Sequence, residues 1–257
     1  MKNLDLINPL FAKPQNLCSN GAFLPLILSL STLTLANGAS EHTEMSQNPL
    51  ALALIILAFF SLTFTILPRV LRWDWSTKYF FVSSLQLGSI GLLGLVPWLC
   101  FLLYASIPLH YRIIAFSTYF FIIFFSIREI ISMYLSIKKN EKFLAYIYQK
   151  SDNQYFYLQK NDSYIMEKKY KLNLFPSAKY FLIFSFAAVA TIPFAKSVVA
   201  FVGLPYPHIF LGIFSIAIDI MALAFVVRGW FVLIHLPKYA TKQNGPVYVD
   251  MSSRTKL

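Results

Sequence analysis

The sequence predicts an all-α bundle of membrane-spanning helices with a small β-meander inserted on its cytoplasmic side. Three observations indicate this fold class. Hydrophobic residues make up 57% of the 257 positions and charged residues only 13%, with a mean hydropathy of +0.60. The apolar residues are gathered in long runs, and the basic residues lie between those runs. Such a composition excludes an ordinary soluble domain.

Five of the apolar runs predict membrane-spanning helices. A helix needs about 20 apolar residues to cross the hydrocarbon core. Runs of about that length occupy residues 50–67, 79–104, 113–137, 180–202 and 209–236. Trp73, Tyr79, Trp98 and Trp230 lie near their ends, as is typical of membrane interfaces. We therefore expect the transmembrane part of the chain at 40–137 and 180–236.

The first 39 residues contain a weaker run, 22–36, which is diluted by Ser, Thr and Pro25. Small residues at Ala36 and Ala39 favour a secretory signal peptide that is removed after them. The 21 residues before the run are long for such a leader, so a retained sixth span and an interfacial segment stay open as alternatives. Whether the weak run is cleaved or retained as a span, the run at 50–67 must enter the membrane from outside.

The basic residues predict the topology. Lys and Arg number two before the weak run, three between the spans at 50–67 and 79–104, nine in 138–179 and four after residue 236. Those segments together hold 18 of the 22 basic residues, whereas the alternate connections hold only Arg112; the other three, Arg128, Lys196 and Arg228, lie inside the spans. Because cytoplasmic loops carry the excess of Lys and Arg, we expect 138–179 and the C-terminus in the cytoplasm.

The longest connection, 138–179, predicts a β-rich insertion. Short runs of Tyr, Phe and Ile alternate there with "SDN" and "KND", which are turn-forming sequences. We expect a three-stranded meander that leans on the membrane surface or on the helix ends, because three short strands alone are marginal. Residues 237–257 are expected to form a basic cytoplasmic tail. Lysine mixed with aromatic residues also suits single-stranded nucleic acid, but anionic lipid headgroups explain it better, and no groove-reading motif occurs.

One stripe of small residues predicts close helix packing. Ser84, Gly88, Gly91 and Gly94 follow one another at spacings of three and four, which places them roughly on one helix face. Such a face lets another backbone approach closely. A hinge at Gly94 and Pro97, of the kind a gated transporter uses, is the alternative.

Charged residues inside the spans are the best candidates for function. At 1.5 Å per residue, Asp219 lies about 15 Å from the outer end of its span and Lys196 about 10 Å, and Glu129 and Arg228 each lie about 12 Å from the inner end. Because charges at such depths usually pair, we expect the pairs Lys196–Asp219 and Glu129–Arg228. Snorkelling to the headgroups is the alternative for the long basic side chains.

No catalytic motif occurs in the sequence. Gly-rich phosphate loops, nucleophile elbows and HExxH are absent, so we expect neither an enzyme nor a cofactor. His42, His110 and His208 all fall on the predicted outer side, but without paired spacing they are more typical of unrelated residues than of a metal site.

Three classes of function remain. The first is a non-enzymatic structural or assembly subunit of a bacterial envelope complex, of a secretion or transfer type, in the cytoplasmic (inner) membrane. The second is a small transporter or channel that uses Asp219 and Lys196. The third is a membrane immunity or exclusion protein. An odd number of spans without internal repeat counts against the transporter, and we prefer the first class by elimination. Its partners would be the lipid bilayer and other membrane-protein subunits.

Overall fold

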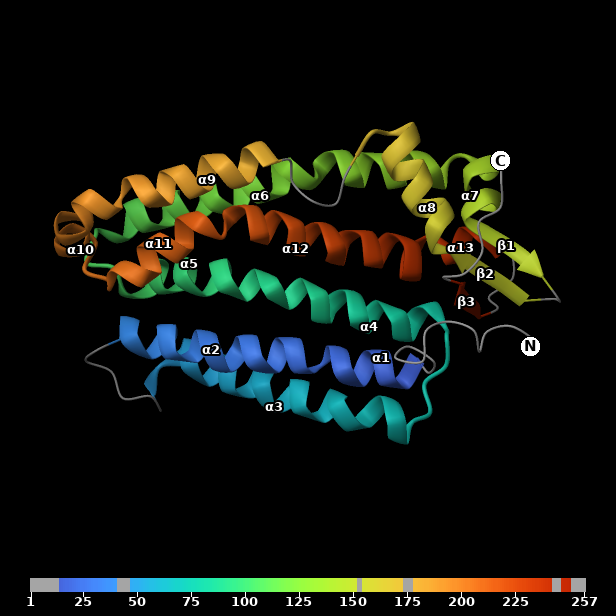
Figure 1. Ribbon diagram of the computed structural model, residues 1–257, viewed down its shortest axis with the longest axis horizontal. Helices are drawn as coiled ribbons and strands as arrows, with labels where there is room; N and C mark the ends of the chain where they lie inside the picture. Colours follow the sequence, from blue (N-terminus) through green and yellow to red (C-terminus); the bar gives the residue numbers. More distant parts are fainter. Residues whose placement is uncertain (1–13, 41–46, 152–153, 173–177, 242–245, 251–257) are drawn as a thin grey trace.

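The protein folds into a bundle of long, roughly parallel helices with a small sheet at one end (Figure 1). The computed structural model describes residues 14–40, 47–151, 154–172, 178–241 and 246–250. Six helical segments in these ranges are long and apolar enough to cross a membrane: Pro14–Ala39, Pro49–Val70, Thr77–Tyr104, Leu109–Lys138, Tyr180–Val202 and Ile216–Ala240. The protein is therefore a multi-pass membrane protein of mainly helical structure.

Most of the spans are divided into shorter helices. The segments are α1 (Pro14–Gly21) with α2 (Phe23–Ala39), α3 (Pro49–Val70), α4 (Thr77–Gly88) joined through η3 (Ser89–Gly91) to α5 (Leu92–Tyr104), and α6 (Leu109–Lys138). They continue with α9 (Ala178–Ala190), η5 (Ile192–Phe194), α10 (Ala195–Val202), α11 (Tyr206–Phe214), α12 (Ile216–Gly229), the π-helix η6 (Trp230–His235) and α13 (Pro237–Ala240). The five runs predicted from sequence coincide with α3, α4–α5, α6, α9–α10 and α11–η6.

The weak first run is also helical. It forms most of α2, and α1 extends it toward the N-terminus. These helices pack on α3, α4 and α5, and they bury Cys18 and Ala36. The link from α2 to α3 is fixed by Asn48, whose side chain accepts from the backbone of Leu50 and Ala51 and donates to the carbonyl of Ala36 at 3.0 Å. A side chain that satisfies the free N–H groups of a helix start in this way is a normal N-cap.

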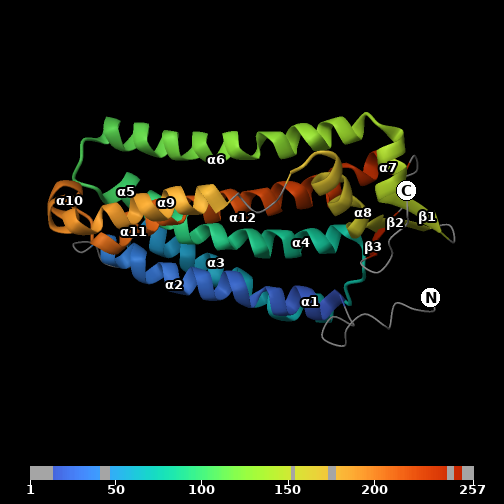
Figure 2. The ribbon, with the colours of Figure 1, turned by 45° about the horizontal axis from the view of Figure 1, so that its top comes forward.

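Helix α12 lies at the centre of the bundle, between α4 and α6 (Figures 1 and 2). Its Ile216, Ile220 and Ala224 are buried against Tyr119, Ile123 and Ile127 of α6. Helix α9, by contrast, packs mainly on α11, and only Ala188 and Val202 of the Tyr180–Val202 span are buried. The bundle therefore has one central span and one span that is largely exposed.

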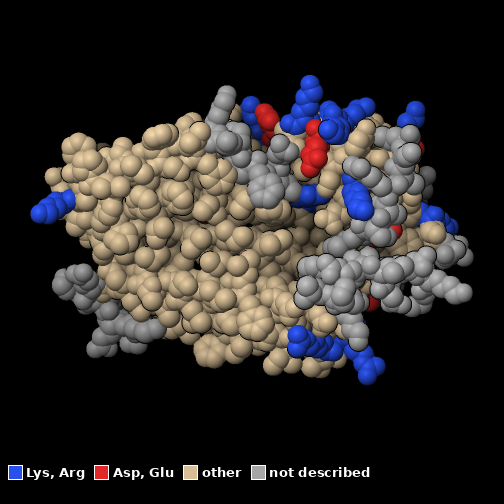
Figure 3. All heavy atoms as spheres, viewed as in Figure 1, with Lys and Arg blue, Asp and Glu red and all other residues tan. Residues whose placement is uncertain are grey.

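Charged side chains are unevenly distributed along the bundle. Figure 3 shows Lys and Arg gathered at the end that carries α7 (Glu141–Ile147), α8 (Gln159–Tyr164) and the strands, with a broad middle zone free of charge on this face. Because lipid tails exclude unpaired charges, this zone is the part of the surface that suits hydrocarbon.

The predicted three-stranded meander is replaced by a different sheet. β1 (Tyr148–Ser151) and β2 (Gln154–Leu158) form an antiparallel hairpin, with Tyr148 opposite Tyr157. The third strand, β3 (Val247–Asp250), comes from the C-terminal segment and runs parallel to β2. Its other edge contacts the link before α4, where the N–H of Val249 donates to the carbonyl of Trp75 at 2.8 Å.

The segment expected as a third strand is helical instead. It forms α8 and the π-helical η4 (Ile165–Lys169). Its buried residues are Asn161, Asp162, Ile165 and Met166, a spacing of three to four that suits a helix and not a strand.

Candidate functional site: a buried carboxylate beside an apolar groove

Asp219 lies near the start of α12 and is 4% exposed. Helix α11 ends at Phe214, and Ser215, whose hydroxyl donates to the carbonyl of Leu211, separates it from α12. Oδ2 of Asp219 accepts a hydrogen bond from the Tyr119 hydroxyl of α6 at 3.0 Å. Oδ1 has no hydrogen-bond partner among the residues that the structure describes. An unsatisfied buried oxygen of this kind usually costs about 1–3 kcal/mol.

Small residues give this carboxylate its space. Gly94 of α5 faces it directly, because an added Cβ there would overlap the Asp219 carboxylate and the Ser215 hydroxyl. A Cβ atom added to Gly91 would lie 3.7 Å from Oδ1 of Asp219, and one added to Gly88 would meet the side chain of Val226. Further along, Ser84 contacts Gly229 of α12. The predicted small-residue stripe therefore lies at the contact between α4–α5 and α12.

A groove of about 380 Å³ runs next to the carboxylate. Its walls come from α3, α4–α5, α6 and α12, and its lining is apolar apart from Ser89, Tyr119 and Asp219. Leu85 and Phe120 at its rim are 46% and 47% exposed, so the groove opens on the side of the bundle that faces lipid. A ligand would reach Asp219 laterally, between α3 and α6.

The expected pair between Lys196 and Asp219 does not form within the chain. Lys196 is exposed on α10, on the uncovered α9–α10 segment, and no ion pair involves it among the described residues. The spans at 180–202 and 209–236 are neighbours, but the pattern could not indicate that Asp219 turns toward α6 and Lys196 away from the bundle.

The second expected pair is replaced by another. Arg228 pairs with Asp162 of α8, with Nη2 2.7 Å from Oδ2, and not with Glu129, which is exposed on α6. The Arg228 Nε also donates to this carboxylate at 2.9 Å, and Asp162 is fully buried. The sequence analysis assigned Asp162 to a turn of the predicted meander, so its pairing with Arg228 was not predicted.

Tyrosine hydroxyls complete this polar cluster. Tyr134 of α6 and Tyr157 of β2 both donate to Asp162, at 3.2 and 2.9 Å. Tyr148 donates to the carbonyl of Val232 at 2.6 Å. Burial raises the pKa of Tyr148 and Tyr157 well above 10.0, and the charge of Asp162 raises that of Tyr157 further. The cluster joins the insertion at 138–172 to α6 and α12, so it holds these elements together.

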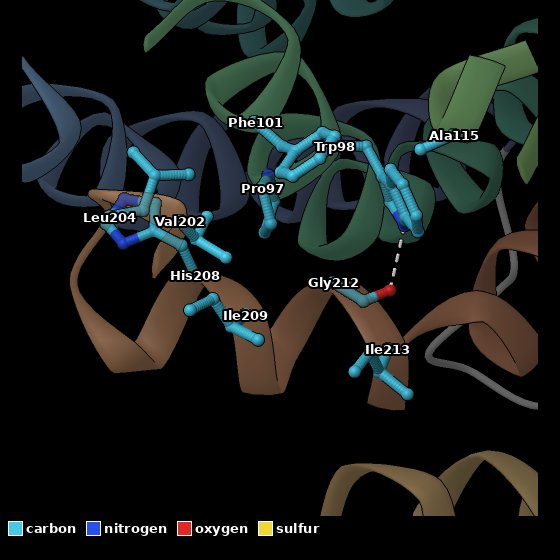
Figure 4. A pocket seen from close by; sticks show the side chains of 10 residues that line it. All are labelled: Pro97, Trp98, Phe101, Ala115, Val202, Leu204, His208, Ile209, Gly212 and Ile213. Carbon is cyan, nitrogen blue, oxygen red and sulfur yellow. Dashed lines mark hydrogen bonds between the residues drawn. The ribbon is translucent and has the colours of Figure 1, made fainter. Parts of the chain in front are cut away.

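A separate apolar pocket of about 170 Å³ lies toward the other end of the bundle (Figure 4). Trp98 borders it and donates through Nε1 to the carbonyl of Gly212 at 2.8 Å. His208 is buried there, and its Nε2 lies 2.7 Å from the carbonyl oxygen of Leu35. His110 is exposed at the start of α6, and His42 lies outside the described residues. No group of metal-ligating side chains is found in the described ranges.

Comparison with known proteins gives no relatives. No family model matches the sequence, and no curated protein and no solved structure matches it. The function must therefore be argued from the site.

Proposed function

We propose that this protein is a non-enzymatic subunit of a membrane protein complex in the bacterial cytoplasmic membrane, of a secretion or transfer type. One observation carries the proposal: a groove on the lipid-facing side of the bundle is lined in part by Asp219, whose Oδ1 has no hydrogen-bond partner among the described residues. Lipid tails can fill such a groove, but they offer no hydrogen-bond donor. A neighbouring protein can supply both the shape and the donor.

The orientation belongs to the same proposal. The insertion at 138–172, the link before α4 and β3 meet at one end of the bundle, where the basic side chains gather (Figures 1 and 3). The excess of Lys and Arg at this end supports a cytoplasmic location for it. Reporter fusions after Gln154 and Lys256 should then report the same, cytoplasmic side. Fusions that report opposite sides would contradict the topology.

A small transporter is the second candidate, because a buried carboxylate at bilayer depth is also what proton coupling requires. The groove favours the subunit of a membrane protein complex, because it opens sideways toward lipid, where a neighbouring protein can bind.

Purification from native membranes in a mild detergent tests the proposal. We expect at least one other membrane protein to remain bound at fixed stoichiometry. Purified protein that carries no such partner, together with proton movement in liposomes that Asp219→Asn abolishes, would support the transporter and refute the subunit.

A further inference from the structure

We propose that a cavity at the end of the bundle that carries the sheet binds the phosphate group of an anionic ligand. The cavity has a volume of about 510 Å³, which lies within the usual range of small-molecule sites. It is bordered by the start of α4, the end of the η6–α13 segment and β3, which meet at this end (Figures 1 and 2). The site is separate from the groove beside Asp219 and does not depend on the proposed function.

Segments far apart in the sequence hold the walls of this cavity in place. Val247 of β3 borders it, and this strand pairs with β2 on one side and bridges to the link before α4 on the other. Leu233 of η6 and Pro237 of α13 form an apolar wall, and both are buried. Because its walls are paired backbone and packed side chains, the cavity is part of the fold.

Two buried hydroxyl groups border the cavity without a partner. Ser76 is 8% exposed and Thr77 is 3% exposed, and both residues line it. Neither hydroxyl forms a hydrogen bond with the residues that the structure describes. Both oxygens keep a small accessible surface, and the open space that the two residues share is this cavity. A molecule that accepts hydrogen bonds there would therefore satisfy them.

The start of α4 adds a backbone donor. The carbonyl of Ser76 accepts from the N–H groups of Tyr79 and Phe80, at 3.1 and 3.2 Å, and Asp74 accepts from the N–H of Ser76 at 2.9 Å. The N–H of Lys78 forms no hydrogen bond with the described residues. Free N–H groups at a helix start carry a partial positive charge and bind anions.

Two lysines give the cavity a net positive charge. Lys78 of α4 and Lys238 of α13 both border it, and neither forms an ion pair within the described chain. None of the described residues that border the cavity is acidic. The two ammonium groups repel each other unless an anion lies between them. A phosphate group suits this set of donors, because it offers several acceptor oxygens to ammonium, hydroxyl and N–H groups at once.

The position of the cavity favours a lipid as the source of the phosphate. Helix α4 begins the span Thr77–Tyr104, and α13 ends the span Ile216–Ala240. The cavity is therefore level with the ends of two spans, where the headgroups of a bilayer lie outside the hydrocarbon. Basic pockets between spans are known to bind anionic headgroups. A soluble phosphate compound carries the same group, so the experiment must separate the two sources.

Native mass spectrometry of the full-length protein in a mild detergent counts the lipids bound to each chain. We expect anionic phosphatidylglycerol to bind more tightly than phosphatidylcholine, which has a phosphate but no net charge. Lys78→Gln combined with Lys238→Gln should weaken phosphatidylglycerol binding by roughly 30-fold, because each lysine near an anionic headgroup contributes about a fivefold factor. Lys139→Gln combined with Lys142→Gln is the matched control. It removes the same charge at exposed positions outside the cavity and should leave binding unchanged.

A second variant tests the hydroxyl groups. Thr77→Val keeps the shape of the side chain and removes its hydroxyl. Because this hydroxyl has no partner within the described chain, the unfolding temperature in lipid-free detergent should stay unchanged or rise. The affinity for phosphatidylglycerol should fall by roughly 10-fold, as expected for a hydrogen bond to a charged group. Lower stability with unchanged affinity would assign the hydroxyl to packing and contradict the site.

Competition identifies the source of the phosphate. Bound phosphatidylglycerol that inorganic phosphate and glycerol phosphate do not displace would assign the site to a lipid headgroup. Displacement by either compound, lost in the Lys78→Gln, Lys238→Gln variant, would assign it to a soluble phosphate compound. Equal affinity for the two lipids without binding of either soluble compound, or equal losses for the two pairs of lysine variants, would overturn the inference.

Discussion

Neutralising both members of the buried Asp162–Arg228 pair should cost less stability than the two single losses added together. The Nη2–Oδ2 distance is 2.7 Å, and the side chains are 13% and 0% exposed. Loss of one partner strands the other charge away from water, which costs about 3–5 kcal/mol. Asp162→Asn and Arg228→Met preserve size while removing charge. The double variant should therefore be more stable than the sum of the single losses predicts, by about 1–3 kcal/mol.

Glu129 provides the control for this cycle, because the sequence pairs it with Arg228 and the structure does not. Glu129→Gln alone should change the free energy of unfolding by no more than about 0.5 kcal/mol. Its effect should add to that of Arg228→Met. Unfolding can be followed by tryptophan fluorescence while dodecyl sulfate is titrated into dodecyl maltoside micelles. Additive losses for Asp162→Asn and Arg228→Met, or coupling between Glu129 and Arg228, would refute the assignment.

Three further predictions concern the packing, the N-terminus and the sheet. Gly94→Ala should destabilise the protein by about 1–3 kcal/mol through overpacking against Asp219. Gly38→Ala should not, because its added Cβ would lie 3.9 Å from the nearest side-chain atom. Thermal unfolding in detergent measures both effects. Because α1 and α2 are packed into the bundle, intact-mass measurement should find residues 14–39 retained; a mass short of 36 to 39 residues would favour the cleaved leader. Raised pKa values favour the neutral phenols of Tyr148 and Tyr157 in the folded state, so their stabilisation is complete below pH 10.0 and declines above it. Tyr157→Phe should weaken this alkaline loss in a pH titration of stability, and an unchanged profile would contradict it.

The positions of the helices could be predicted from the sequence because hydrophobic run length is a local property. The same holds for the small-residue stripe, whose spacing of three and four already defines a helix face. The third strand could not be predicted, because β3 pairs with β2 across about 90 residues of chain, and nothing in either segment specifies its partner. The partner of Arg228 was missed for a related reason. Asp162 lies 66 residues away, in a segment that is helical but contains turn-forming residues and was therefore not predicted as a helix.

The two charged sites differ in where a partner can come from. At the end of the bundle that carries the sheet, the insertion at 138–172 folds back and supplies Asp162 to Arg228, and Asp162 also accepts from the hydroxyl groups of Tyr134 on α6 and Tyr157 on β2. At the depth of Asp219 no loop can reach, because only helices cross the hydrocarbon. The neighbouring helices supply one hydroxyl, that of Tyr119, and otherwise present Gly91, Gly94 and apolar side chains. A second donor for this carboxylate must therefore come laterally, from another helix in the membrane.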